Sequence, residues 1–273
     1  MLLKGLENII LKLIVVRLFH LKLNCLKFVA FRIHSERNRR MELIQRYVSK
    51  ELTQFVGRHT PEYERFRVLM DIIQSGWILP GPFTNGQTYN VQLHETEKDL
   101  EKMILPQMVC FADIPINDLS LHMEKYSNFG IAFKKDYLVQ YGANPVLYVT
   151  QNGQMEGKDV TREKWFLDHL KKYALLKEKI QTFGMQNGGK EINELFLEID
   201  QFLMKDLFAY LKPFDSSKND ADEDNYYLER EWRIIGNLPF SQSNITRILI
   251  PEKYGRMLRE YLPDYTGQIS FTE

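Results

Sequence analysis

The sequence predicts an α+β fold, in which a mixed central sheet of about six strands is flanked by helices and carries a helical-hairpin insertion. Short runs of β-branched and aromatic residues recur along the chain, each bounded by turn residues, which is typical of strands. Other stretches repeat apolar residues at three- and four-residue steps, which indicates amphipathic helices. No internal repeat is present, so the sequence does not predict a repeat array.

The composition is that of an ordinary globular protein, since 44% of the 273 residues are apolar and 26% are charged. Cys25 and Cys110 lie in no metal-binding spacing, so we expect a reducing, cytoplasmic compartment and no metal site. The formal net charge is zero, but residues 41–273 hold 27 basic against 34 acidic side chains. General nucleic-acid binding is not expected, because phosphate contacts need clustered Lys and Arg.

Residues 1–40 form a basic apolar segment, with nine Lys or Arg side chains against Glu7 and Glu36. Basic residues interrupt the apolar ones, so no run reaches the roughly 18 residues that a membrane helix needs. One interpretation makes Met41 the true start and the segment an over-extended reading frame. The alternative is an amphipathic helix on a membrane surface. Residues 41–273 are then predicted to be a single α+β domain, and no membrane partner is expected.

The first part of this domain predicts a strand and a helix. Leu52–Gly57 reads as the strand, and Thr60 as the N-cap of a helix that starts at Pro61 and stops at Gly76. The buried stripe of this helix is expected to be Tyr63, Phe66, Met70 and Ile73. Further along, Leu93–Met103 mixes acids and lysines and predicts a solvated helix.

The densest signals lie between Pro106 and Val149. Met108–Phe111 predicts a strand that ends before Pro115, and Asn117 or Asp118 is expected to cap the next helix. On that helix Leu119, His122 and Tyr126 share one face, so His122 and Tyr126 should be neighbours. Phe129, Ile131 and Phe133 then alternate with Gly130 and Ala132. This alternation predicts a strand with a small face that can approach another backbone or a ligand.

Residues 161–212 are predicted to be the helical hairpin, with Gly184–Gly189 between its two helices. The apolar stripes are Phe166, Leu170, Tyr173, Leu176, Ile180 and Phe183 on the first helix, and Ile192, Leu195, Phe196, Ile199 and Leu203 on the second. Such a hairpin either covers one side of the sheet or binds a partner. The acidic stretch Pro213–Asp224 after it is expected to be a mobile linker.

Tyr226–Ile235 predicts a late strand, on which Glu229, Glu231 and Arg233 would share one face. The C-terminal part predicts a strand, a helix and an edge strand at Thr246–Ile250, Glu252–Leu262 and Gln268–Phe271. The usual motifs of nucleoside triphosphate hydrolysis, dinucleotide binding, zinc proteolysis and serine hydrolysis are absent from the sequence.

Several of these stretches resemble the AbiGi family of abortive-infection proteins in bacterial phage resistance. The resemblance is carried by CFADIP, His122, Tyr126, FGI, NPVLYV and YYLEREWR, and by Leu52–Phe55 upstream. Two positions differ from what the family leads us to expect, because Gln54 stands in place of His and Ser127 in place of Gly. The resemblance implies an antitoxin-like component of a toxin–antitoxin pair. Its partner would be a cognate, nucleotidyltransferase-like toxin protein, whose basic surface the acidic body could cover.

A second resemblance, to the ADP-ribosyltransferase fold, rests on the order of Gln54, His122, Tyr126 and Glu231 along strand, helix and late strand. It implies an enzyme that uses NAD in phage defence, with Glu231, His122 and Tyr126 as catalytic residues. Gln54, Arg233 and Glu229 would then bind the cofactor, Arg233 by its bidentate fork. Without this resemblance no cofactor is implied.

The same residues also allow a purely structural interpretation. Glu229 and Glu231 could form ion pairs with Arg230 and Arg233, while His122 links helix to sheet by ordinary hydrogen bonds. A shared cleft that contains Gln54, Tyr126 and Glu231 would favour the enzyme, whereas separated surface positions would favour a binding protein. The sequence leaves this choice open.

Overall fold

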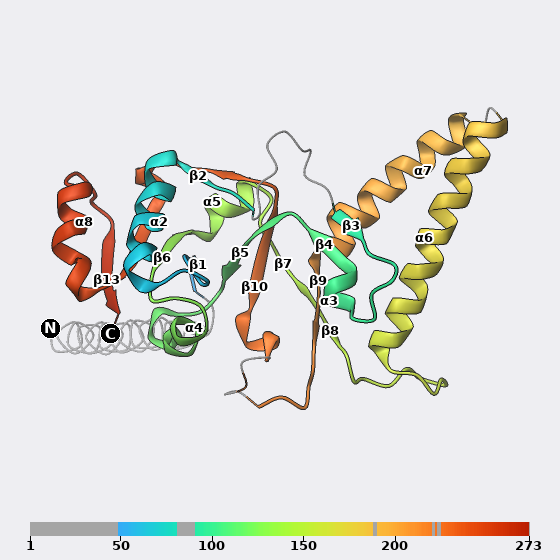
Figure 1. Cartoon of the computed structure of the whole chain (residues 1–273), viewed down its shortest axis with the longest axis horizontal. Coiled ribbons are helices and arrows are strands. Elements are labelled where there is room, and N and C mark those ends of the chain that lie inside the picture. Colours follow the sequence, from blue (N-terminus) through green and yellow to red (C-terminus); the bar gives the residue numbers. More distant parts are fainter. Residues whose placement is uncertain (1–48, 81–90, 188–189, 220–221, 223–224, 273) are drawn as a thin grey trace, which may run out of the picture. The chain divides into compact units, whose positions relative to one another are not determined.

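The computed structural model describes residues 49–80, 91–187, 190–219, 222 and 225–272 (Figure 1). The basic segment at 1–40 and the start proposed at Met41 lie outside the described residues. The described residues belong to one compact unit, Tyr47–Glu273. None of the helices within them is long and apolar enough to span a membrane.

A seven-stranded sheet forms the centre of this unit, in the order β13-β12-β6-β1-β5-β10-β7. Only β12 and β13 pair in parallel, so the sheet is mixed, as expected. Its strands are β1 (Glu51–Phe55), β5 (Met108–Ala112), β6 (Gly130–Lys134), β7 (Asn144–Pro145), β10 (Glu231–Ile235), β12 (Ile245–Pro251) and β13 (Gln268–Thr272). The α+β prediction is confirmed, and the predicted last strand lies at the sheet edge.

Three two-stranded sheets and seven α-helices, together with short 3₁₀ and π turns, complete the described fold. The small sheets pair β2 (Trp77–Ile78) with β11 (Leu238–Pro239), β3 (Val91–Leu93) with β4 (Ile104–Pro106), and β8 (Leu147–Thr150) with β9 (Leu211–Phe214). The helices are α2 (Glu62–Ser75), α3 (Leu100–Met103), α4 (Ser120–Lys125), α5 (Lys135–Gln140), α6 (Arg162–Asn187), α7 (Lys190–Phe202) and α8 (Gly255–Tyr261). The C-terminal helix is therefore shorter than expected, because a 3₁₀ turn occupies Glu252–Tyr254.

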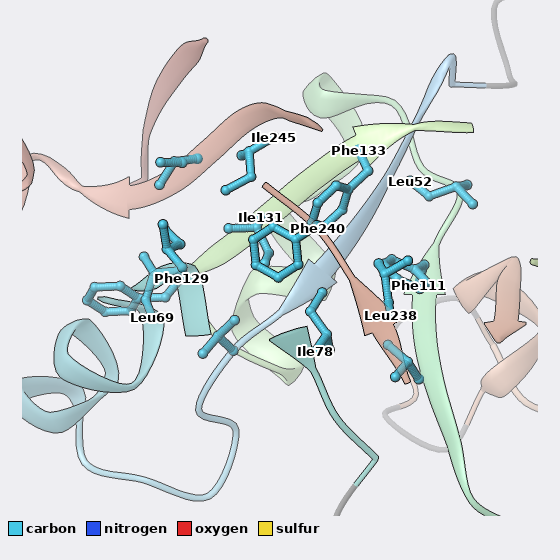
Figure 2. Close-up of a cluster of buried hydrophobic side chains, with 14 of the residues drawn as sticks. Leu52, Leu69, Ile78, Phe111, Phe129, Ile131, Phe133, Leu238, Phe240 and Ile245 are labelled. Carbon is cyan, nitrogen blue, oxygen red and sulfur yellow. The ribbon is translucent and has the colours of Figure 1, made fainter. Parts of the chain in front are cut away.

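The main core lies on one face of the sheet and includes Leu52, Phe111 and Ile131 of the strands together with Leu69 of α2 (Figure 2). Each fully buried side chain of this size contributes roughly 1.5–3 kcal/mol of transfer free energy. Successive residues of a strand point to opposite faces, so the neighbours of these core residues lie on the other face of the sheet. That second face holds the polar residues described below.

Helix α2 follows its sequence signals with two differences. Gly76 ends the helix in the left-handed conformation, with φ of 69°, as expected of its stop signal. Thr60 does not cap the helix, because its hydroxyl donates to the Gly57 carbonyl oxygen. The buried residues of α2 are Phe66, Leu69, Met70 and Ile73. The prediction that Tyr63 is among them is wrong, because its side chain is 72% exposed. Tyr63 lies in the first turn of the helix, next to the exposed residues Arg58 and His59.

The predicted helix at Leu93–Met103 is mostly wrong. Leu93 belongs to β3, and only Leu100–Met103 is helical. The Asp99 side chain accepts hydrogen bonds from the backbone N–H groups of Glu101 and Lys102 and so caps the helix. The observed helix therefore begins at Leu100 and occupies only the last turn of the predicted one. The predicted caps of α4 are wrong as well, because Asn117 and Asp118 form a separate 3₁₀ turn and Leu119 occupies the N-cap.

The two long helices α6 and α7 lie side by side, as the predicted hairpin requires (Figure 1). Helix α6 continues through Gly184, which the sequence placed between the helices. Asp200 of α7 accepts hydrogen bonds from Tyr173 at 2.6 Å and from Lys177 at 2.7 Å, both on α6. Phe196 and Asp200 are the residues of α7 that face α6. The predicted apolar stripe of α7 is therefore only partly buried. Its exposed residues are Ile192, Leu195 and Ile199.

Two predictions for the segment between residues 213 and 235 are wrong. Pro213, expected in a mobile linker, is buried in β9, which pairs with β8. The late strand starts at Glu231 rather than Tyr226, because Tyr226–Glu229 is a 3₁₀ turn. Arg230 then adopts a left-handed conformation with φ of 45°, which breaks the strand before Glu231.

Candidate functional site

A pocket of about 290 Å³ opens on the sheet face opposite the main core. Its walls come from β1, β5, β9, β10, α4 and the 3₁₀ turn at Tyr226–Glu229. The polar residues that border it include Gln54, His122, Tyr126, Lys212, Glu229 and Glu231. Segments more than 170 residues apart in the sequence thus meet at one site.

Strand register explains why Glu231 reaches this pocket. Thr53 of β1 pairs with Ala112 of β5, which pairs in turn with Glu231 of β10. Residues directly opposite one another on paired strands share a face of the sheet. Thr53, Ala112 and Glu231 therefore form a row across the floor of the pocket.

Glu231 and Arg233 form a buried ion pair, with the Arg233 Nε donating to Glu231 Oε1 at 2.6 Å. Arg233 also donates through Nη1 to the carbonyl oxygens of Ala209 at 2.6 Å and Leu211 at 3.1 Å. Burial alone would raise the pKa of the Glu231 carboxyl, but the charges of Arg233 and Lys212 outweigh it and hold that pKa below its ordinary value. Arg233 thus anchors the chain between α7 and β9, and it does not line the pocket.

Lys212 of β9 brings a buried cation into the pocket. Its Nζ lies 2.8 Å from Glu101 Oε1, 3.5 Å from Glu231 Oε2 and 3.8 Å from Glu229 Oε2. Burial would lower the pKa of this ammonium, but the neighbouring carboxylates, led by Glu231, raise it above its ordinary value. Lys212 therefore stays protonated. Sequence reasoning missed this residue, although a lone charge in the run Leu211–Phe214 was a visible signal.

Glu229 joins the pocket through the turn that precedes β10. The Tyr126 hydroxyl donates to Glu229 Oε1, and Lys125 Nζ lies 3.0 Å from the same oxygen. Burial and then the Glu229 charge raise the pKa of Tyr126, so the phenol keeps its proton. The left-handed Arg230 lies between Glu229 and Glu231, and both glutamates border the pocket although only Glu231 is in the strand.

His122 and Tyr126 are neighbours on α4, as expected, with ring centroids 6.2 Å apart. Phe55 of β1 stacks on both rings, at 6.5 Å from His122 and 5.9 Å from Tyr126. Burial lowers the pKa of His122 below its ordinary value, so the ring is neutral near pH 7. Its Nδ1 is buried and has no hydrogen-bond partner.

Gln54 borders the pocket, but its side chain belongs to the other face of the sheet. It pairs with Ile131, which lies in the main core, whereas the adjacent Thr53 and Phe55 face the pocket. Its Oε1 is buried without a hydrogen-bond partner. From the predicted set, His122, Tyr126, Glu229 and Glu231 border the pocket. Arg233 lies beside Glu231 on the same face of the sheet but does not border the pocket.

The pocket contains charged and aromatic groups but no metal-binding cluster. Across the described residues, no group of three or more His, Cys, Asp or Glu side chains is arranged to hold a metal ion. Burial and then the charge of Glu231 raise the pKa of the Cys110 thiol well above its ordinary value, so Cys110 is not a ready nucleophile. The neutral ring of His122 and the carboxylates of Glu229 and Glu231 are the groups that can accept hydrogen bonds there.

The family model that matches residues 83–266 is described as "Putative abortive phage resistance protein AbiGi, antitoxin". A curated relative from Lactococcus lactis subsp. cremoris, named "Abortive phage resistance protein AbiGi", is 24% identical over 159 residues. That alignment covers 53% of this chain, and the chain spans just over half (56%) of the length of this relative. No solved structure matches the chain. The range matched by the family model contains Lys212, Glu229 and Glu231, and both helices of the hairpin.

Proposed function

Because this chain belongs to the AbiGi family of abortive phage resistance proteins, we propose that it is the antitoxin-like component of a toxin–antitoxin pair and binds a cognate toxin protein. The observation that carries this proposal is the match of residues 83–266 to a family described as an antitoxin. The cytoplasmic location expected from the sequence is part of the same proposal, as are the single domain at 41–273 and its insertion at 161–212.

The exposed face of α7 supports a protein-binding role. Four apolar side chains at three- and four-residue steps are between 46% and 60% exposed, namely Ile192, Leu195, Ile199 and Phe202. Single exposed apolar residues are common, but a continuous stripe on a helix is typical of a surface that packs into an apolar groove of a partner. We assign this stripe, the α7 stripe, to the toxin.

The acidic residues of this chain favour a toxin whose contact surface has basic residues at its edge. Helix α7 carries Glu191, Glu194 and Glu198 close to the stripe, and residues 41–273 have seven more acidic than basic side chains. Opposite charges at the edge of an interface speed association and select the partner. The contacts of Asp200 with Tyr173 and Lys177 hold the other side of α7 against α6, so the stripe is presented on a supported helix.

The toxin is expected to be encoded by the gene adjacent to that of this chain, and to be nucleotidyltransferase-like. Expressed alone, the adjacent gene product should stop bacterial growth, and co-expression of this chain should restore it. Leu195→Glu should abolish that rescue, because it places a charge at the centre of the α7 stripe. Val139→Glu on α5 is the matched control, since Val139 is also exposed and apolar. Full rescue by Leu195→Glu would reject the assignment of the stripe, and an adjacent gene product without toxicity would reject the pair.

A second candidate function is NAD-dependent ADP-ribosyl transfer on an ADP-ribosyltransferase-like fold. One observation favours it, because a single pocket gathers His122, Tyr126, Glu229 and Glu231. Of the other expected cofactor ligands, Gln54 borders the pocket with its side chain on the opposite face of the sheet, and Arg233 does not border it. Nicotinamide release from NAD by the purified protein tests this candidate. Release that is lost in Tyr126→Phe would support it, and no release above a protein-free control would reject it.

A further inference from the structure

We propose that the pocket between β1, α4 and β10 binds a small, uncharged sugar, whose hydroxyl groups donate hydrogen bonds to His122 and to the two glutamates. This site does not depend on toxin binding, because it lies on the sheet rather than on α7. The inference rests on the unused acceptors of the pocket, on its balance of charge and on its aromatic wall.

His122 supplies the first unused acceptor. Its side chain hydrogen-bonds to the backbone of Leu228, and burial keeps the ring neutral. A neutral imidazole carries one N–H donor and one acceptor nitrogen. Because Nδ1 is buried and has no partner, it is the acceptor nitrogen that remains unsatisfied. A ligand hydroxyl would satisfy it, whereas an empty pocket leaves a buried polar atom at a cost in free energy.

The glutamates supply two more acceptors. Glu229 Oε1 already accepts hydrogen bonds from Tyr126 and Lys125. Glu231 Oε1 already accepts one from Arg233. The Oε2 atoms lie 3.8 Å and 3.5 Å from the Lys212 Nζ, which is longer than an ordinary hydrogen bond. A carboxylate oxygen can accept more than one hydrogen bond, so both glutamates can accept from a ligand beside His122, which favours a ligand with several donors.

Charge balance favours an uncharged ligand. Three cations, Lys125, Lys212 and Arg233, meet three carboxylates, Glu101, Glu229 and Glu231, through the contacts given above. A charged ligand among these buried groups would lose its hydration without a buried counter-charge left to pair with it, because the remaining cation of the lining, Arg58, is exposed and lies over the Tyr126 ring at 4.7 Å. Hydroxyl groups, in contrast, donate to carboxylates without disturbing this balance.

The aromatic wall and the volume favour a ring of sugar size. Phe55 and Tyr126 stack with an angle of 17° between their planes, and both border the pocket. Because Arg58 lies over the Tyr126 ring at 4.7 Å, Phe55 is the ring of this wall that would accept the apolar C–H face of a sugar while the hydroxyl groups reach the polar wall. The volume of about 290 Å³ lies near the lower end of the range for ligand pockets, roughly 300–1,000 Å³.

The sugar could come from a free monosaccharide or from a nucleoside, and ligand-detected NMR on the purified full chain distinguishes the two sources. The probes are D-ribose, adenosine and 2′,3′-dideoxyadenosine, which keeps the base but lacks the hydroxyl pair. Binding of ribose and adenosine, but not of the dideoxy analogue, is expected for a free sugar site. Binding of adenosine alone supports a nucleoside site. Equal binding of the dideoxy analogue, or no binding of any probe, would overturn the proposal.

His122→Gln tests the acceptor directly, since glutamine can still donate to the Leu228 backbone but has no atom in place of Nδ1. It should weaken adenosine binding by about tenfold, as expected for one hydrogen bond. His59→Gln is the matched control, because His59 lies in an exposed turn. Unchanged affinity in a folded His122→Gln variant would contradict the assignment. The probe comparison uses the unmodified protein, so it decides the question even where this variant does not fold.

Discussion

Replacing Glu231 with glutamine is expected to destabilise the protein. The change keeps the size of the side chain but removes the charge that holds Arg233, and both side chains are at most 6% exposed. Breaking a buried ion pair by removing one partner costs about 3–5 kcal/mol. The carbonyl oxygens of Ala209 and Leu211 still accept hydrogen bonds from Arg233 in this variant. We therefore expect the free energy of unfolding to fall by about 3 kcal/mol, the lower end of that range.

A thermal melt measures this cost. For a domain of this size, a loss of about 3 kcal/mol lowers the melting temperature by roughly 6–12 °C. Glu260→Gln is the matched control, because Glu260 pairs with Arg256 Nε at 3.1 Å on the surface of α8. Exposed ion pairs contribute little, so its melting temperature should not change.

The result also separates two roles of Glu231. The resemblance to the ADP-ribosyltransferase fold implies a catalytic carboxylate, whose replacement by glutamine would remove activity and leave stability almost unchanged. The buried pair with Arg233 predicts a loss of stability instead. A melting temperature of Glu231→Gln equal to that of the unmodified protein would refute this reasoning, because it would mean that Arg233 does not depend on the charge.

Three further predictions follow from other contacts. The pKa of Glu231 is lowered in the folded state, so the ionised carboxylate stabilises the fold above the ordinary pKa of 4.5. This stabilisation is lost as the pH falls through the folded-state pKa. Thermal melts of Glu231→Gln at acid pH should therefore lack this part of the loss of stability. Gly130→Ala should cost about 1–3 kcal/mol in a urea titration, because the new Cβ would lie 2.9 Å from the Gln54 carbonyl oxygen; equal stability would contradict that close packing. Asp113→Asn should lower the melting temperature, because Lys135 Nζ lies 2.8 Å from the buried Asp113 carboxylate; no change would mean that this pair adds nothing to stability.

Local signals in the sequence were sufficient where neighbours in the chain determine the structure. Gly76 ends α2 because a left-handed residue is needed there, and glycine adopts that conformation without strain. His122 and Tyr126 meet because four residues make about one helical turn. The small face that contains Gly130 was expected to approach another backbone or a ligand, and Gly130 packs on the backbone of β1.

Other features depend on tertiary contacts that no local pattern contains. Periodicity alone does not show which side of α7 faces α6, because the buried Phe196 and the exposed Ile199 belong to one periodic series. Arg230 adopts a positive φ that is uncommon for a residue with a Cβ, so the start of β10 was placed five residues early. Lys212 was assigned to the end of the hairpin, and only the pairing of β9 with β8 shows that it enters the pocket.

The central claim is that the α7 stripe binds the toxin, and titration calorimetry with the purified adjacent gene product tests it most directly. We expect the unmodified chain and Val139→Glu to bind the toxin with equal affinity. Leu195→Glu should bind it at least about thirtyfold more weakly, which corresponds to about 2 kcal/mol for a residue at the centre of an interface. Equal affinities for all three proteins would contradict the claim.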